Sequence, residues 1–117
     1  MMEYTNANRV LIDTFHEMEN IYNNHIEEYR DLPYAFYESE FVPFIMTQLQ
    51  LNNLPMLSKI FGFIERLFSD GDEMTANLAE VAIVESLFFE NDYSKYENMI
   101  LSLCGEKTRK SFEDCSI

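Results

Sequence analysis

The sequence feature that most constrains the fold is a run of apolar residues spaced for one face of an α-helix. Between residues 57 and 68 they stand at i, i+3, i+4, i+7, i+10 and i+11: Leu57, Ile60, Phe61, Ile64, Leu67 and Phe68. Because an α-helix has 3.6 residues per turn, this spacing gathers the side chains into a single stripe. The segment is therefore predicted to be an amphipathic helix with its stripe in a core.

Similar spacing predicts helices along most of the remaining chain. The segments concerned are 5–30, 41–51, 73–89, 92–105 and, as a short last helix, 106–114. Within 5–30, the weak helix formers Asn20, Asn23 and Asn24 leave open a kink or a break into two helices. Segment 73–89 is apolar over most of its circumference, which is typical of a central helix. Strict alternation of apolar and polar residues, the mark of a strand, nowhere lasts more than four residues.

The links between these segments predict how the helices follow one another. Pro33 disfavours helical geometry in the residue before it, so segment 31–40 is interpreted as a connector. The links at 52–53 and 70–72 are short, which favours antiparallel neighbours. The predicted fold is all-α: a compact single domain, residues 1–117, of five or six antiparallel helices in a helical-hairpin stack or bundle.

Charge narrows the classes of partner. The 117 residues carry 21 acids and eight Lys or Arg, a net charge of −13, while 15% aromatic residues argue against disorder. Such a field repels nucleic-acid phosphates and anionic membranes and attracts basic protein surfaces. An alternative stays open, that the acidity only keeps an aromatic-rich chain soluble.

Motifs for catalysis, cofactors or metals are absent from the sequence. Asp70-Gly71-Asp72 lacks the ligands that a calcium loop needs further on, and the single Asp13/His16 pair falls short of a di-iron set. Cys104 and Cys115 are too few for a disulfide framework. The first residues lack the basic and apolar regions of a signal peptide, so none is expected there, and no stretch is long and apolar enough for a membrane span. We expect a cytoplasmic protein that is not an enzyme and binds no cofactor.

Two blocks of the sequence, 57–87 and 103–112, resemble a known group of proteins. The first is a helix, an acidic glycine turn at Ser69-Asp70-Gly71-Asp72 and an apolar helix; the second contains Gly105-Glu-Lys-Thr-Arg109. Together they resemble the small, acidic, all-helical bacterial immunity proteins of contact-dependent growth inhibition and related polymorphic-toxin systems. This resemblance implies a stoichiometric inhibitor of one cognate toxin, in many cases a nuclease with a basic cleft. The alternative is an intracellular regulatory or adaptor module that binds another protein.

Helix direction predicts where such a partner would bind. If the helices alternate in direction, the end of segment 5–30, the connector 31–40 and the turn at 70–72 meet at one end of the domain. Capping of helix starts explains some of the acids there, but not Glu27 and Glu28 near a helix C-terminus. Aromatic residues beside charge are favoured in binding hot spots. The partner-binding surface is therefore predicted to contain Glu27, Glu28, Asp31, Tyr34, Tyr37, Glu38, Glu40, Asp70, Asp72 and Glu73.

Overall fold

A computed structural model of the chain describes residues 1–116 and is helical nearly throughout. The one pairing of extended segments in this range is an isolated parallel bridge between Met2 and Gly71. Within the same range no helix is long and apolar enough to cross a membrane. In chain order the elements are η1 (Tyr4–Asn6), α1 (Ala7–Thr14), η2 (His16–Met18), α2 (Glu19–Asn24), α3 (Ile26–Tyr29), α4 (Pro33–Phe36), η3 (Tyr37–Phe41), α5 (Val42–Gln50), α6 (Leu54–Asp70), α7 (Glu73–Leu78), η4 (Ala79–Glu85), α8 (Ser86–Phe88), α9 (Tyr93–Leu103) and α10 (Glu106–Cys115).

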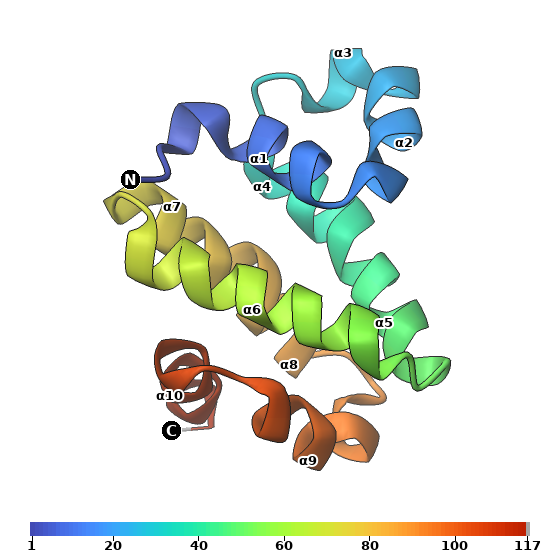
Figure 1. The fold of residues 1–117 in the computed structure, drawn as a ribbon, viewed down its shortest axis with the longest axis vertical. Coiled ribbons are helices and arrows are strands. Elements are labelled where there is room, and N and C mark those ends of the chain that lie inside the picture. Colours follow the sequence, from blue (N-terminus) through green and yellow to red (C-terminus); the bar gives the residue numbers. More distant parts are fainter. Residues whose placement is uncertain (117) are drawn as a thin grey trace.

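The all-α prediction is confirmed, but the number of helices and their arrangement differ from the prediction. Consecutive elements merge into longer rods at α4–η3–α5 and α7–η4–α8, and residues 1–116 form eight rods rather than five or six. Rods α5, α6 and α7–α8 reverse direction at tight turns, whereas α1, α2 and α3 point in different directions across one side of α6 (Figure 1). The arrangement is therefore not antiparallel throughout.

The first predicted helix, 5–30, is broken at two residues. Phe15 has φ −128° and ψ 87°, and His25 has φ −127° and ψ 33°, so neither continues a helix. At the first break the fully buried Phe15 ring enters the core, where its centroid lies 5.3 Å from that of Phe41 and 5.4 Å from that of Phe63. Leu11, Phe15 and Met18 face the core, whereas Ile26 in the same segment is 38% exposed. The helix is thus interrupted at a buried residue, Phe15.

The predicted connector, 31–40, is mostly helix. Pro33 ends the preceding segment but also occupies the first turn of α4, where its missing N–H costs nothing. Phe36 and Tyr37 are fully buried, and the Tyr37 hydroxyl donates a 2.7 Å hydrogen bond to the Ala7 carbonyl. Phe36 and Tyr37 are thus core residues that hold the rod α4–η3–α5 against α1.

Segment 73–89 is only partly the central helix that its composition predicted. Leu78 and Leu87 are fully buried, and α6 crosses the middle of the molecule between α1 and the pair α9–α10 (Figure 1). On the other edge of α7–η4–α8, however, Val81 remains 39% exposed and Met74 54% exposed. One edge of this apolar rod therefore faces solvent.

A carboxylate on α6 caps the last helix and joins the two sequence blocks 57–87 and 103–112. Glu65 accepts hydrogen bonds from the Thr108 backbone N at 2.9 Å, the Thr108 Oγ1 at 2.8 Å and the Lys107 backbone N at 3.2 Å. Gly105 leaves room for it, because a Cβ there would come within 2.6 Å of Glu65 Oε1. Burial raises the pKa of Glu65, but these hydrogen bonds outweigh burial and hold the pKa below its usual value of 4.5.

Truncation of the buried edge of α7–η4–α8 should destabilise the protein strongly. Leu78→Ala or Leu87→Ala should each lower the free energy of unfolding by ~2–5 kcal/mol, because each leaves a cavity in the core. Val81→Ala on the exposed edge is the matched control and should change it by about 0.5 kcal/mol or less. Urea unfolding followed by circular dichroism measures all three; an equal loss for Val81→Ala would contradict the described packing.

Loss of the Glu65 charge should destabilise the protein in a pH-dependent way. At neutral pH, Glu65→Gln should lower the free energy of unfolding by ~0.5–1.5 kcal/mol, as loss of a helix cap does. The folded pKa of Glu65 is depressed, so the stabilisation is present above the unfolded pKa and is lost as pH falls through the folded pKa, below 4.5. The difference between wild type and variant should therefore shrink in that window. Glu113→Gln, in an exposed ion pair on α10, should show little effect at either pH.

Candidate functional site: an acidic groove along α7–η4–α8

Four of the predicted site residues, Tyr34, Asp70, Asp72 and Glu73, do lie near one another. The Tyr34 hydroxyl accepts a 2.6 Å hydrogen bond from Asn77 Nδ2, and Tyr34 and Glu73 line the same surface hollow. Asp72 accepts hydrogen bonds from the backbone N of Thr75 at 2.9 Å and of Tyr4 at 3.1 Å. The hydrogen bonds from Thr75 and then Tyr4 lower the pKa of Asp72. Asp72 is therefore the N-cap of α7, as predicted, and its carboxylate is already engaged.

Two predicted residues are engaged inside the fold, Tyr37 by full burial and the half-buried Glu40 by a hydrogen bond. Tyr37 is fully buried against Ala7, which removes it from the predicted contact surface. Glu40 accepts a 2.5 Å hydrogen bond from the Tyr29 hydroxyl, and this bond is the main reason that the pKa of Tyr29 rises to about 12. Glu40 thus ties η3 to α3 instead of facing a partner.

The remaining predicted acids are dispersed. Glu27 and Glu28 are exposed on α3, and Asp31 borders a small separate hollow with Tyr4 and Arg30. Glu38 lines a separate hollow between η3 and η4, whereas Glu40, two residues further on, contacts Tyr29 of α3. The prediction of one acidic cluster depended on a first helix that ends near residue 30 and on a connector at 31–40. The break at His25 instead places Glu27 and Glu28 in the first turn of α3, and Glu38 and Glu40 lie on the helical segment η3.

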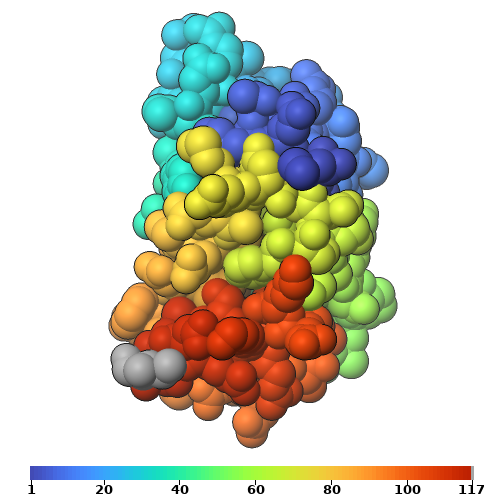
Figure 2. All heavy atoms as spheres, turned by 90° about the vertical axis from the view of Figure 1, so that its left-hand side faces the viewer, coloured from blue at the N-terminus to red at the C-terminus, as the bar shows by residue number. Residues whose placement is uncertain are grey.

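A continuous groove, absent from the sequence-based prediction, follows the exposed edge of α7–η4–α8. It consists of a first hollow of about 590 Å³ between α7 and α10, a second of about 580 Å³ between η3 and η4, and a central hollow of about 240 Å³ that shares lining residues with both. Figure 2 shows this face, with α7 and η4 running between α4 and α10. We call the three hollows together the acidic groove.

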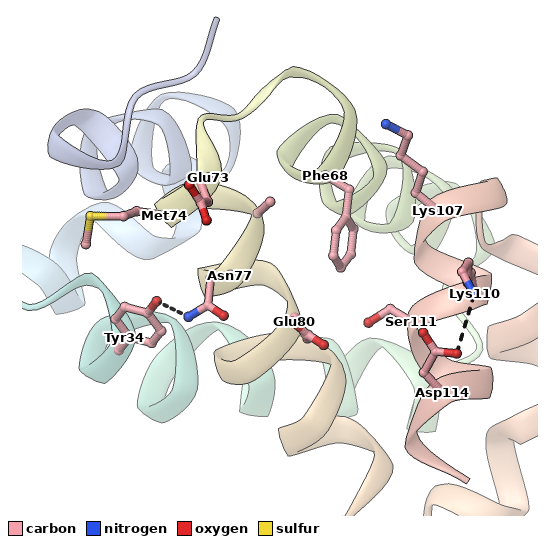
Figure 3. Close-up of a pocket in the computed structure, with 11 residues that line it drawn as sticks. Tyr34, Phe68, Glu73, Met74, Asn77, Glu80, Lys107, Lys110, Ser111 and Asp114 are labelled. Atoms are coloured by element: carbon pink, nitrogen blue, oxygen red, sulfur yellow. Dashed lines mark hydrogen bonds and ion pairs between the residues drawn. The ribbon is translucent and has the colours of Figure 1, made fainter. Parts of the chain in front are cut away.

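The lining of the acidic groove combines negative charge with exposed apolar side chains. Phe89, at the end of α8, is 72% exposed, and Met74 and Val81 share the same edge of the rod. Figure 3 shows how the first hollow is walled by Tyr34 on one side and by Lys110, Ser111 and Asp114 on the other. The charged residues of the groove are Glu38, Glu73, Glu80, Glu85, Glu90 and Asp114 as acids and Lys107 and Lys110 as bases.

Most of these carboxylates have no cationic partner. Within residues 1–116, lysine and arginine form two ion pairs, Arg109–Glu113 at 3.4 Å and Lys110–Asp114 at 3.6 Å, both along α10. Unpaired like charges around a hollow repel one another and strengthen the local negative potential. The groove is therefore suited to a cationic partner that also carries apolar side chains.

The described residues give little support to metal or thiol chemistry. No group of three or more His, Cys, Asp or Glu side chains within residues 1–116 is placed to hold a metal ion. Cys104 and Cys115 are both free thiols. Burial is the main cause that raises the pKa of Cys104 to about 12, which disfavours the nucleophilic thiolate.

Comparison with known proteins assigns a family and no activity. A family model described as a domain of unknown function (DUF7674) matches residues 8–116, nearly the whole chain. No curated protein and no solved structure matches the chain.

Both thiols should react slowly in the folded protein. With a pKa of about 12 instead of 9.0, Cys104 carries roughly a thousandfold less thiolate near neutral pH than an ordinary thiol. The pKa of Cys115 is raised as well, mainly by burial. Titration of non-reduced protein with a thiol reagent should be slow before denaturation and should count two thiols after it. Finding no thiols in the denatured chain would contradict the description of both as free.

Proposed function

We propose that this chain, which belongs to the family described as a domain of unknown function (DUF7674), is an inhibitor that binds a basic toxin domain through the acidic groove. The observation that carries the proposal is the groove itself, which combines six carboxylates and two lysines with the exposed side chains of Met74, Val81 and Phe89. Carboxylates supply attraction and orientation, and exposed apolar residues supply the contact area that anchors a partner.

The identity of the partner as a toxin rests on the sequence resemblance to immunity proteins. The two resembling blocks, 57–87 and 103–112, form the rod that floors the groove and most of the helix that walls it. A nuclease holds nucleic acid in a cleft lined with Lys and Arg, because these side chains bind phosphate. The carboxylates of the groove would take the place of those phosphates and block the cleft, in the cytoplasm of the cell that makes the toxin.

A direct test is inhibition of an identified toxin. The chain should be co-purified with the product of the gene adjacent to its own, and nuclease activity should be titrated with increasing amounts of the chain. Loss of activity at a ratio of one to one supports the proposal. A partner protein without toxic activity would favour the regulatory or adaptor alternative, and an acidic partner or direct binding of nucleic acid would overturn the proposed inhibitor.

Reversal of groove charges should weaken binding beyond the effect of net charge. In Glu38→Lys/Glu73→Lys/Glu90→Lys, three exposed groove acids are reversed; the matched control reverses three exposed acids elsewhere, Glu17, Glu27 and Glu28. Both variants lose the same long-range attraction, so association should slow in both. Dissociation should accelerate, by about tenfold or more, in the groove variant alone, because local contacts determine the dissociation rate.

Surface plasmon resonance against the identified partner, at two salt concentrations, separates these rates. Circular dichroism verifies that both variants keep their helical content. If the control variant dissociates faster and the groove variant does not, the partner binds the α3 side of the molecule, where Glu27 and Glu28 lie, and the groove is not the site.

A further inference from the structure

The central hollow of the acidic groove has a chemistry of its own. Its volume is about 240 Å³, and it lies where the first and second hollows meet. Six residues line it: Glu80, Glu85, Phe89, Ser111, Asp114 and Cys115. The pKa of the Cys115 thiol is raised by burial and further by Glu85, Glu80 and Asp114, in that order. The three carboxylates, two from η4 and one from α10, therefore border the same hollow.

The π-helical geometry of η4 explains why two of these carboxylates lie on the same side of the helix. Glu80 and Glu85 are five residues apart. In an α-helix, at about 100° per residue, they would diverge by about 140°. In a π-helix residues i and i+5 are joined by a hydrogen bond and lie one turn apart on the same side. The π-segment thus turns both glutamates toward the hollow.

A buried hydroxyl without a partner faces the same space. Ser111 is 9% exposed, and its Oγ makes no hydrogen bond to any described residue. Its side chain points from α10 toward Glu80 across the groove (Figure 3). A buried hydroxyl that lacks a partner costs stability, and such exceptions call for an explanation. A hydrogen-bond donor supplied by a bound group would remove this cost.

Cations differ in how well they fit the central hollow. A metal ion does not fit, because these side chains are not placed to surround one within the described part of the chain. The lysine at the rim, Lys110, is 3.6 Å from Asp114 and partly neutralises it, but Glu80 and Glu85 have no cationic partner. A flat group with several donors can reach separated carboxylates and the Ser111 hydroxyl together.

We infer that the central hollow is a binding pocket for an arginine side chain of the basic partner. The guanidinium donates to Glu80, Glu85 and Ser111, and its face packs on the ring of Phe89, which is 72% exposed at the rim. Arginine is preferred over lysine because its planar fork carries five donors and stacks on aromatic rings, whereas an ammonium is compact and strongly hydrated. The inference rests on the proposed function, since it names the residue by which the partner enters the groove.

Titration of the free protein with a small arginine probe tests the pocket without the partner. The isotope-labelled chain is titrated with N-acetyl-L-arginine methylamide and with the matching lysine compound, and amide shifts are followed by NMR. The arginine compound should give saturable shifts at residues 80–85, 89 and 111–115 and should bind more tightly than the lysine compound. Equal response to both compounds, or no saturable shift at these residues up to the solubility of the probe, would overturn the pocket.

Neutral variants identify the groups responsible. Glu80→Gln/Glu85→Gln should weaken binding of the arginine probe by about tenfold or more, since hydrogen bonds between charged groups are lost. The matched control Glu17→Gln/Glu97→Gln removes the same charge at exposed positions outside the groove and should bind as wild type does. If the control binds the arginine probe as weakly as Glu80→Gln/Glu85→Gln does, the loss is due to net charge alone, and the pocket is overturned.

Ser111→Ala separates a binding role from a structural one. Because the hydroxyl makes no hydrogen bond to a described residue, the variant should melt at the same or a higher temperature than wild type. It should nevertheless bind the arginine probe more weakly, and a clear loss of stability with unchanged binding would show a structural hydroxyl instead. Partner binding that depends on Glu38, Glu73 and Glu90 while the arginine probe fails would leave the proposed function standing and reject the pocket alone.

Discussion

The packing of three fully buried phenylalanines, Phe15, Phe41 and Phe63, is the contact on which the rest of the fold depends. Their ring centroids lie 5.3–5.9 Å apart, and Phe63 meets the other two nearly edge to face, an arrangement that aromatic quadrupoles favour. One ring comes from the break after α1, one from η3 and one from α6. The cluster therefore joins the N-terminal segments to the central helix α6 and holds the rod α4–η3–α5 in place.

The position of the rod α4–η3–α5 creates one wall of the acidic groove. Because Phe36, Tyr37 and Phe41 are drawn into the core, the opposite side of α4–η3 presents Tyr34 and Glu38 to α7–η4–α8. The other wall is α10, whose start is capped by Glu65 from α6. Both walls are thus positioned by side chains outside the groove, so the groove should be preformed and a partner should meet little reorganisation cost.

An amphipathic helix usually buries its apolar face and exposes its charged face, but the rod α7–η4–α8 exposes apolar and charged side chains together. The rod α7–η4–α8 buries Leu78, Ala82 and Leu87 and still leaves Met74, Val81 and Phe89 exposed beside glutamates. Exposed apolar side chains that border unpaired charge are a poor arrangement for stability alone, since repulsion between carboxylates is not relieved. The same arrangement is favourable for a binding surface, which gains area from the apolar residues and specificity from the charges.

Periodicity and charge in the sequence were enough to determine the all-α class, the cap at Asp72, the turn between α6 and α7 and the strongly negative net charge. These features depend on local spacing or on composition, both of which can be read from the sequence.

The position of the site was decided by tertiary structure. Phe36 and Tyr37 could be assigned to a loop or to a core, and only the tertiary packing makes them core residues of a helical segment. The π-geometry of η4 likewise has no signature in the residue pattern, because an α-helical wheel places Glu80 and Glu85 far apart. The acids could thus be counted in advance, but the directions in which they point follow from how the core is filled.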